Sequence, residues 1–160
     1  MKQEALNHPN NDLNNVSFQQ KSTALSLVIT IGATVYYIVN MWPMRTLSLD
    51  NNAMPDGFGT LVIGTVGLII IAQIVLQSAL AIWAGAAPAA TAYEKLAALK
   101  ATRNACILLT VGVFIVIGSV FVAELTPFYT ANFAILSFAL AEIVKDASLL
   151  FYGRSQIGSK

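Results

Sequence analysis

Charged residues are scarce in this chain and are missing altogether from three long stretches. Asp, Glu, Lys and Arg together make up 11% of the 160 residues, and none of them occurs within residues 22–44, 57–93 or 104–123. Soluble globular domains carry about 25% charged residues. Since 56% of the residues are hydrophobic, the scarcity of charge excludes the ordinary soluble globular class.

Histidine and cysteine are nearly absent. His8 is the only histidine and lies in an Asn-rich segment, and Cys106 is the only cysteine, which excludes an internal disulfide. No histidine within the apolar stretches is available to ligate haem or zinc, and neither a glycine-rich phosphate loop nor a glycine-bounded serine motif occurs. We therefore expect no metal and no cofactor. Cys106 is interpreted as a small core residue rather than a reactive thiol.

Four apolar stretches are long enough to cross a bilayer. A transmembrane helix needs about 20 consecutive, mostly apolar residues, and each stretch reaches that length. The sequence thus predicts an all-α fold, a four-helix transmembrane bundle that forms one domain. The predicted spans are residues 22–44, 59–84, 104–123 and 126–152.

The distribution of positive charge predicts the orientation of these spans. Seven of the nine Lys and Arg residues flank one side of them, whereas only Arg45 lies clearly on the other. An excess of Lys and Arg marks the cytoplasmic side, so we expect both termini and the middle loop to be cytoplasmic. Residues 1–21 then form a polar, disordered cytoplasmic tail and residues 153–160 a second, short one. The net charge of +1 gives no reason to expect nucleic acid as a partner.

The connections between the spans differ in character. Residues 50–57 are rich in turn formers and predict an irregular external loop. The turn at residues 124–127 is so short that the third and fourth spans must lie side by side, and the four spans form two antiparallel hairpins. Residues 89–103 favour a helix, either an interfacial one or a cytosolic extension of the third span. The candidate contacts with a partner or with lipid in this segment are Tyr93, Lys95 and Lys100.

A few polar residues within the spans share one predicted depth. At a rise of about 1.5 Å per residue, they fall in the inner part of the membrane. Such a cluster is either a polar pocket or ion path that opens to the cytoplasm, or an interfacial ion-pair cluster that fixes the helix register. The second interpretation is favoured, because Lys145 and Asp146 lie near enough to the surface to be hydrated. The predicted cluster consists of Gln73, Gln77, Arg103, Asn104, Glu142 and Lys145.

Parts of the chain resemble a group of small, uncharacterised bacterial four-helix membrane proteins. That group carries an Asp-Glu-Arg-Asp run in the middle loop and a basic-x-x-basic-x-Ala entry into the third span. Residues 100–105 (Lys-Ala-Thr-Arg-Asn-Ala) are similar to the entry, the run is reduced to residues 92–95 (Ala-Tyr-Glu-Lys), and residues 141–154 are similar to the end of the last span. The resemblance covers about a quarter of the chain. It implies a multi-pass protein of a bacterial inner membrane and no particular activity.

Three classes of function are compatible with these features. The leading hypothesis is a non-enzymatic membrane protein that acts as an accessory or interaction subunit or as a homo-oligomer. The alternative is a small oligomeric transporter or channel, with Gln73, Glu142 and Lys145 lining a path, since four helices rarely enclose a pore alone. A membrane enzyme that acts on lipid or quinone is the third and least favoured class.

Overall fold

The described part of the chain is helical throughout its regular structure. The computed structural model describes residues 9–51, 53–83, 92–122 and 125–154. It describes side-chain environments within these ranges from Phe18 to Gly153, except at Asn51 and Trp83. Among these residues there are five helices and no strand, which confirms the predicted all-α class. The helices are α1 (Pro9–Met41), α2 (Met44–Asn51), α3 (Phe58–Trp83), α4 (Ala92–Val120) and α5 (Pro127–Arg154).

Three of these helices are long and apolar enough to cross a membrane. They comprise Phe18–Met41 of α1, Phe58–Ile82 of α3 and Ala92–Val120 of α4. Their surfaces expose many large apolar side chains, a pattern that suits lipid as the solvent. The chain is therefore a membrane protein. The 28-residue helix α5 is not one of the three, and the predicted fourth span stays a prediction.

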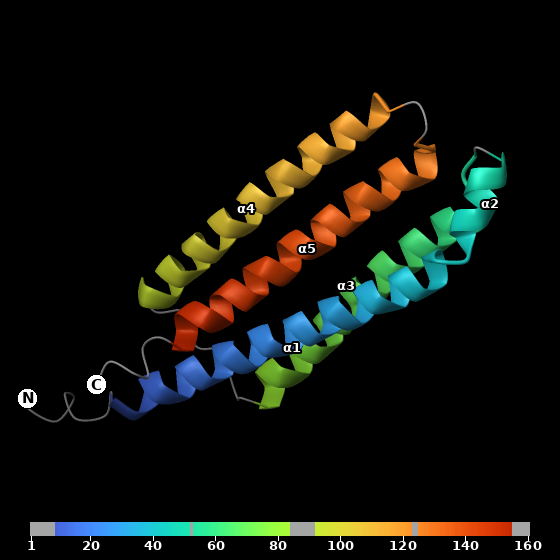
Figure 1. Cartoon of the computed structure of the whole chain (residues 1–160). Helices are drawn as coiled ribbons and strands as arrows, with labels where there is room; N and C mark the ends of the chain where they lie inside the picture. The colour runs from blue at the N-terminus through green and yellow to red at the C-terminus, as the bar shows by residue number, and fades with distance from the viewer. Residues whose placement is uncertain (1–8, 52, 84–91, 123–124, 155–160) are drawn as a thin grey trace, which may run out of the picture.

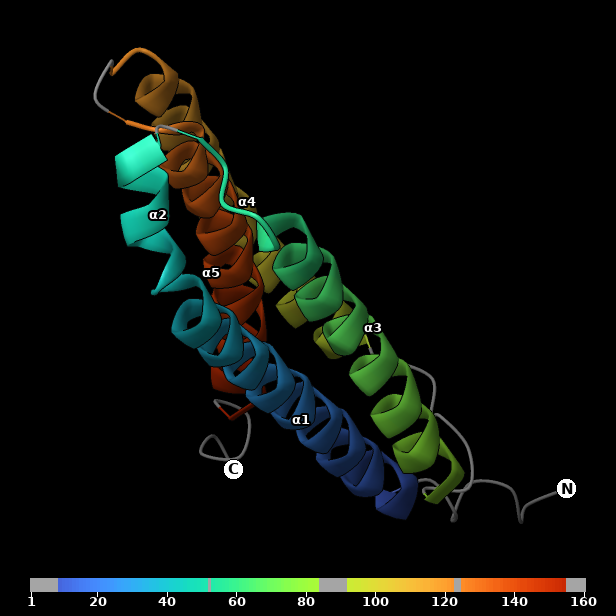
Figure 2. The same cartoon turned by 90° about the vertical axis from the view of Figure 1, so that its right-hand side faces the viewer.

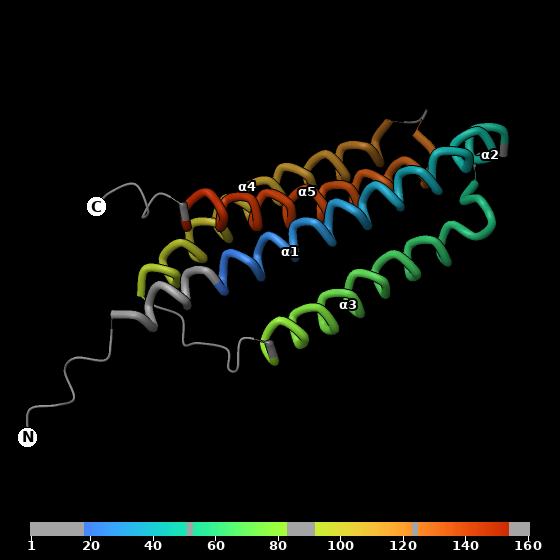
Figure 3. The backbone as a smooth tube through the Cα atoms, turned by 90° about the horizontal axis from the view of Figure 1, so that it is seen from below, coloured from blue at the N-terminus to red at the C-terminus, as the bar shows by residue number. Residues whose placement is uncertain are grey.

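The four long helices run side by side, with α5 at the centre of the arrangement. Figures 1 and 2 show α5 between α4 and α1, while α3 packs against α1 on the other side. The view from below separates α3 from the α4–α5 pair (Figure 3). As a result α5 meets protein on two sides, whereas α3 is held mainly by α1.

Small residues allow α4 and α5 to approach closely. Ala97, Ala101 and Ala105 are buried one turn apart along α4, and Gly112 continues the same face. A Cβ atom at Gly112 would overlap the side chain of Ser137 on α5, so only glycine fits there. Small interfacial residues of this kind are the usual means by which membrane helices pack.

The short helix α2 closes one end of the bundle. It begins just after the Trp42–Pro43 turn that ends α1, where proline cannot continue the helix. Its Ser48 is completely buried and lies 2.8 Å from the hydroxyl of Thr126, the residue that precedes α5. This hydrogen bond joins the connection between α1 and α3 to the connection between α4 and α5. The predicted irregular loop at residues 50–57 is thus helical up to Asn51.

An aromatic cluster fills the core beside α2. Tyr37, Phe58 and Phe128 are all buried and come from α1, α3 and α5. The rings of Phe58 and Phe128 meet edge to face with centroids 5.1 Å apart. Gly57 precedes α3 with a φ of +83°, which glycine adopts without strain and which turns the chain into this cluster.

Two helices begin earlier than the predicted spans. The tail predicted to be disordered is helical from Pro9, and residues 1–8 lie outside the described part. At the middle connection α4 is one continuous helix from Ala92, so the segment is an extension of the third span and not a separate interfacial helix. In both cases an established helix propagates through neighbouring residues at low cost once no proline or glycine interrupts it.

Candidate functional site

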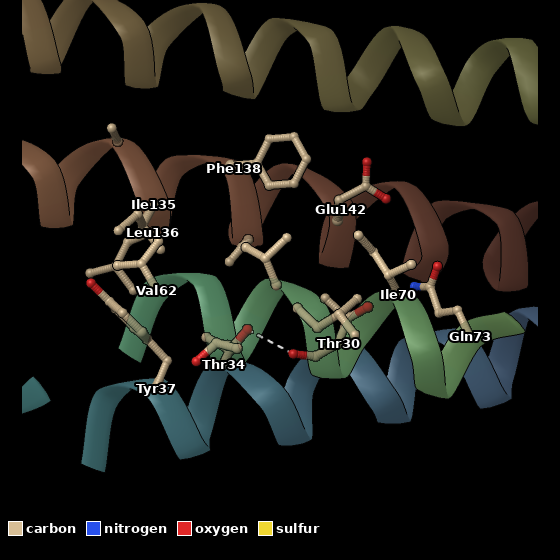
Figure 4. Close-up of a pocket in the computed structure, with 15 residues that line it drawn as sticks. Thr30, Thr34, Tyr37, Val62, Ile70, Gln73, Ile135, Leu136, Phe138 and Glu142 are labelled. Atoms are coloured by element: carbon tan, nitrogen blue, oxygen red, sulfur yellow. Dashed lines mark hydrogen bonds between the residues drawn. The ribbon is translucent and has the colours of Figure 1, made fainter. Parts of the chain in front are cut away.

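A cleft of about 600 Å³ lies between α3 and α5, with α1 behind it. Three helices contribute its walls, and it runs along the helix axes rather than across them (Figure 4). Its volume falls within the range of roughly 300–1,000 Å³ that is typical of ligand sites. The lining consists of Thr30, Thr34 and Tyr37 of α1, Val62, Thr65, Val66, Ile69, Ile70 and Gln73 of α3, and Ala134, Ile135, Leu136, Phe138, Ala139 and Glu142 of α5.

Most polar groups in these walls are already satisfied within the protein. The hydroxyl of Thr34 donates to the carbonyl of Thr30 at 2.7 Å, and the hydroxyl of Thr65 donates to the carbonyl of Leu61 at 2.8 Å. Each bond returns to the residue's own helix, as threonine side chains commonly do in apolar surroundings. The hydroxyl hydrogens of Thr34 and Thr65 are therefore used within α1 and α3, and the remaining walls of the cleft are mostly apolar.

The hydroxyl of Tyr37 is also occupied. It donates to Oδ1 of Asn132 at 2.6 Å, and Nδ2 of Asn132 in turn donates to the carbonyl of Phe128 at 2.7 Å. Both side chains are buried, so this short chain of hydrogen bonds joins α1 to α5 where neither group has access to water. Sequence reasoning did not identify Asn132, although an asparagine within a predicted span was a signal for such a bond.

The opposite end of the cleft carries its available polar groups. Gln73 and Glu142 lie together at that end, away from Tyr37 (Figure 4). Glu142 forms an ion pair with Lys145, one turn further along α5, and both side chains are about one-third exposed. Within the described residues no hydrogen-bond partner occupies the Gln73 amide, which lines the cleft. This end of the site thus offers hydrogen-bonding capacity with no net charge.

Asp146 is the most deeply placed of the carboxylates described. Only 5% of the residue is exposed, and one oxygen accepts a hydrogen bond from Ser26 of α1. Its other oxygen, Oδ2, has no hydrogen-bond partner within the described part of the chain. The expectation that Asp146 is hydrated is therefore wrong, because α1 covers it. Its position one turn after Glu142 was visible in the sequence, but the covering helix was not.

The predicted polar cluster is only partly assembled. Gln73, Glu142 and Lys145 come together around the end of the cleft, whereas Gln77 and Arg103 are exposed on other faces. Asn104 is half-buried on α4 and turns to a different part of α5. Its amide donates to the hydroxyl of Tyr152 at 3.2 Å and to that of Ser148 at 3.4 Å.

The candidate partner segment is the first three turns of α4. Tyr93 donates its hydroxyl to the carbonyl of Tyr152 at 3.0 Å, and the ammonium of Lys100 lies 5.9 Å from the centroid of the Tyr152 ring. Lys95 is exposed. These contacts fasten the start of α4 to the end of α5 and leave its basic residues on the surface.

Two further observations concern thiol and metal chemistry. Cys106 is exposed on α4, so its interpretation as a core residue is wrong: in lipid a small apolar side chain can face outward at no cost. Histidine, cysteine and carboxylate residues form no group suited to a metal ion in the described ranges, and His8 lies outside them.

Comparison with known proteins gives no relative from which a role can be taken. No protein-family model, no curated protein and no solved structure matches this chain. The resemblance to the small bacterial four-helix proteins therefore stays a prediction. The cleft, the buried Asp146 and the start of α4 have to be interpreted from their own chemistry.

Proposed function

We propose that the chain is a four-span protein of a bacterial inner membrane, with both termini cytoplasmic, and that it acts as a non-enzymatic interaction subunit or homo-oligomer. The fourth span in this proposal is α5. Its 28 residues correspond to about 42 Å of helix, which exceeds the roughly 30 Å of the hydrocarbon core. Its polar residues Asn132 and Asp146 are buried against neighbouring helices, where their cost in a bilayer is smallest.

The positions of interfacial residues support the same orientation. Trp42 is exposed at the end of α1, and the guanidinium of Arg45 lies 4.6 Å from the centroid of its ring. Tryptophan is enriched at both membrane–water boundaries, so this end of the bundle suits one of them. The opposite end carries Lys95, Lys100 and Arg103, as expected of a cytoplasmic face.

The exposed side chains at the start of α4 are the main support for the proposal that the protein has a partner. Twenty-nine residues give α4 a length of about 43 Å, so its first two turns extend beyond the hydrocarbon core if Val120 lies at the outer boundary. In these turns Leu96 is 48% exposed and Leu99 is 69% exposed, beside the exposed Lys95 and Lys100. Apolar side chains that lie outside the lipid core and have polar neighbours mark an interaction surface.

Site-specific photo-cross-linking tests this surface. A photo-cross-linking amino acid at position 99 is expected to give a discrete protein adduct in membranes, either with a second copy or with another membrane protein. The matched control is position 114, because Phe114 is 70% exposed on the same helix but lies within the span. Lipid adducts alone at both positions, together with a monomer in mild detergent, would contradict the proposal.

Transport is the second candidate function, and Asp146 is the observation that favours it. Buried carboxylates within membrane helices commonly mark ion or proton paths. In reconstituted liposomes a transporter would give ion flux above that of empty liposomes, and Asp146→Asn would abolish it. Asp50→Asn is the control, since Asp50 is exposed on α2. No flux, or equal flux in Asp146→Asn and the unaltered chain, rejects this function.

A further inference from the structure

The cleft between α3 and α5 has the polarity of an amphiphile. Its body is apolar over most of its length, because the hydroxyls of Thr34, Thr65 and Tyr37 are hydrogen-bonded within the protein. The longer polar side chains of Gln73 and Glu142 lie at one end. We infer that the cleft binds one neutral amphiphile from the bilayer, with the apolar chain between α3 and α5 and the polar head against the Gln73 amide. The inference rests on the four-span arrangement proposed above but not on a partner at the start of α4.

The apolar body of the cleft distinguishes ligands by their shape and not by their hydrophobicity. Lipid tails are as apolar as Val66, Ile70 or Ala139, so removing a chain from the bilayer into the cleft gains little by itself. The chain must nevertheless fill the space, because a void inside a bilayer forfeits packing contacts on all its walls. Selective binding of one molecule over the surrounding lipid therefore depends on the head end.

The head end lies where water cannot satisfy it. Gln73 is 15 residues, or about 22 Å, along α3 from Phe58, which places its amide inside a hydrocarbon core of about 30 Å. A polar group without a partner at this depth is unfavourable, and a ligand that hydrogen-bonds to it removes that cost. A hydroxyl, ester or ketone on the ligand suits an amide, which both donates and accepts.

The charges nearby indicate that the head is neutral. Glu142 at this end is already paired with Lys145, so the two together carry no net charge. A cationic or anionic head would gain attraction from one member of the pair and repulsion from the other, and it would also lose hydration on entering the bilayer. A neutral head avoids both costs, and the amide of Gln73 provides its recognition.

Photolabelling of the full chain in mild detergent tests the head end. The probe is a monoacylglycerol with a diazirine in its acyl chain. We expect it to label residues of α3 and α5 that line the cleft, and to do so at lower concentration than the corresponding anionic fatty acid or cationic acylcholine. Gln73→Leu should weaken labelling about three- to tenfold, the usual value of one hydrogen bond. Gln77→Leu is the control, because Gln77 is exposed one turn further along α3 and outside the cleft.

A second pair of variants tests the body of the cleft. Ala139→Trp fills it and should reduce labelling at least fivefold, whereas Leu140→Trp places the same ring on the exposed face of α5 and should leave labelling within twofold. Competition by unlabelled monoacylglycerol in the unaltered chain gives the same test without a substitution.

Labels spread evenly over exposed residues of α1, α3 and α4 would overturn the inference, as would equal labelling of Gln73→Leu and Gln77→Leu. If the cleft is labelled only after a dimer dissociates, a second copy of the chain occupies the cleft, and the inference is also overturned. These outcomes are independent of cross-linking at position 99.

Discussion

Helices α4 and α5 approach each other closely at Gly112, and a single methyl group tests this contact. Gly112→Ala adds a Cβ atom that would overlap Cβ and Oγ of Ser137 and lie 3.5 Å from its Cα. The Cβ atom of Ser137 is held in place by the α5 backbone, so it cannot rotate away from the added methyl group as the far end of a flexible side chain could. The two helices must therefore separate, and the neighbouring contacts along this interface would loosen with them.

Two effects of opposite sign determine the result of Gly112→Ala. Forcing an extra methyl group into a packed interface costs about 1–3 kcal/mol. Alanine is favoured over glycine within a helix by about 1 kcal/mol, which offsets part of that cost. Gly118→Ala experiences only the second effect, because nothing lies within 4 Å of a Cβ atom at Gly118. The difference in unfolding free energy between the two variants should thus be about 1–3 kcal/mol, with Gly112→Ala the less stable.

Unfolding of the purified chain in mixed micelles, followed by circular dichroism as a denaturing detergent is added, measures this difference. The double variant Gly112→Ala with Ser137→Gly should recover most of the loss, since removal of the Ser137 side chain removes the atoms that overlap. Equal stability of Gly112→Ala and Gly118→Ala would refute the close approach of α4 and α5. A double variant that recovers nothing would refute the assignment of the cost to Ser137.

Three further predictions concern a buried hydrogen bond, a buried carboxylate and the orientation of the chain; the first two use the same preparation and the third uses living cells. Tyr37→Phe leaves the buried Asn132 oxygen without its donor and should lower stability by about 1–3 kcal/mol, whereas Tyr36→Phe on the exposed face should change it little. Asp146→Asn should raise the unfolding free energy by about 1 kcal/mol, because it keeps a polar side chain beside Ser26 without burying a charge; lower stability would contradict this. A green fluorescent protein fused after Lys160 should fluoresce and an alkaline phosphatase fused there should be inactive; the reverse result would place the C-terminus outside.

The helices themselves could be predicted because long runs without charge have few alternatives. In a bilayer every backbone polar group has to be satisfied within the segment, and a helix does so. The end of α1 at Met41 follows from Pro43, and the start of α3 at Phe58 follows from the turn at Gly57. The continuation of α4 back to Ala92 was one of two alternatives, and the absence of a helix breaker decided between them.

The short turn before α5 predicted that α4 and α5 lie side by side, but the way this pair packs against α1 and α3 could not be predicted from the sequence. A helix that is apolar all round has no face that identifies its neighbour, so the hydrophobic pattern did not place α5 between α1 and α4. The expected burial of Cys106 and hydration of Asp146 failed for the same reason. In lipid, exposure depends on which helices pack together, and polarity alone does not determine it.

The candidate site shows the same limit at the level of single residues. The helical rise gives the depth of each polar residue, but direction changes by 100° at every position. Gln73 and Gln77 are one turn apart, yet only Gln73 lines the cleft. Arg103 and Asn104 are adjacent, and Asn104 turns to Tyr152 while Arg103 is exposed. A shared depth for these residues therefore stays a prediction, and the sequence did not show which of them line a common cleft.

The polar residues of α5 explain why this helix, rather than α3, lies at the centre. A membrane helix that is covered by protein on few sides, as α3 is, can carry few groups that need a partner. Asn132 finds its partner on α1, and Asp146 accepts a hydrogen bond from Ser26 on the same helix. On its other side α5 meets α4, where Thr130 accepts a hydrogen bond of 3.1 Å from Ser119. Each of these bonds requires a neighbouring helix at a fixed distance. The polar side chains of α5 thus select its position between α1 and α4, and the same packing leaves the side facing α3 open as the cleft.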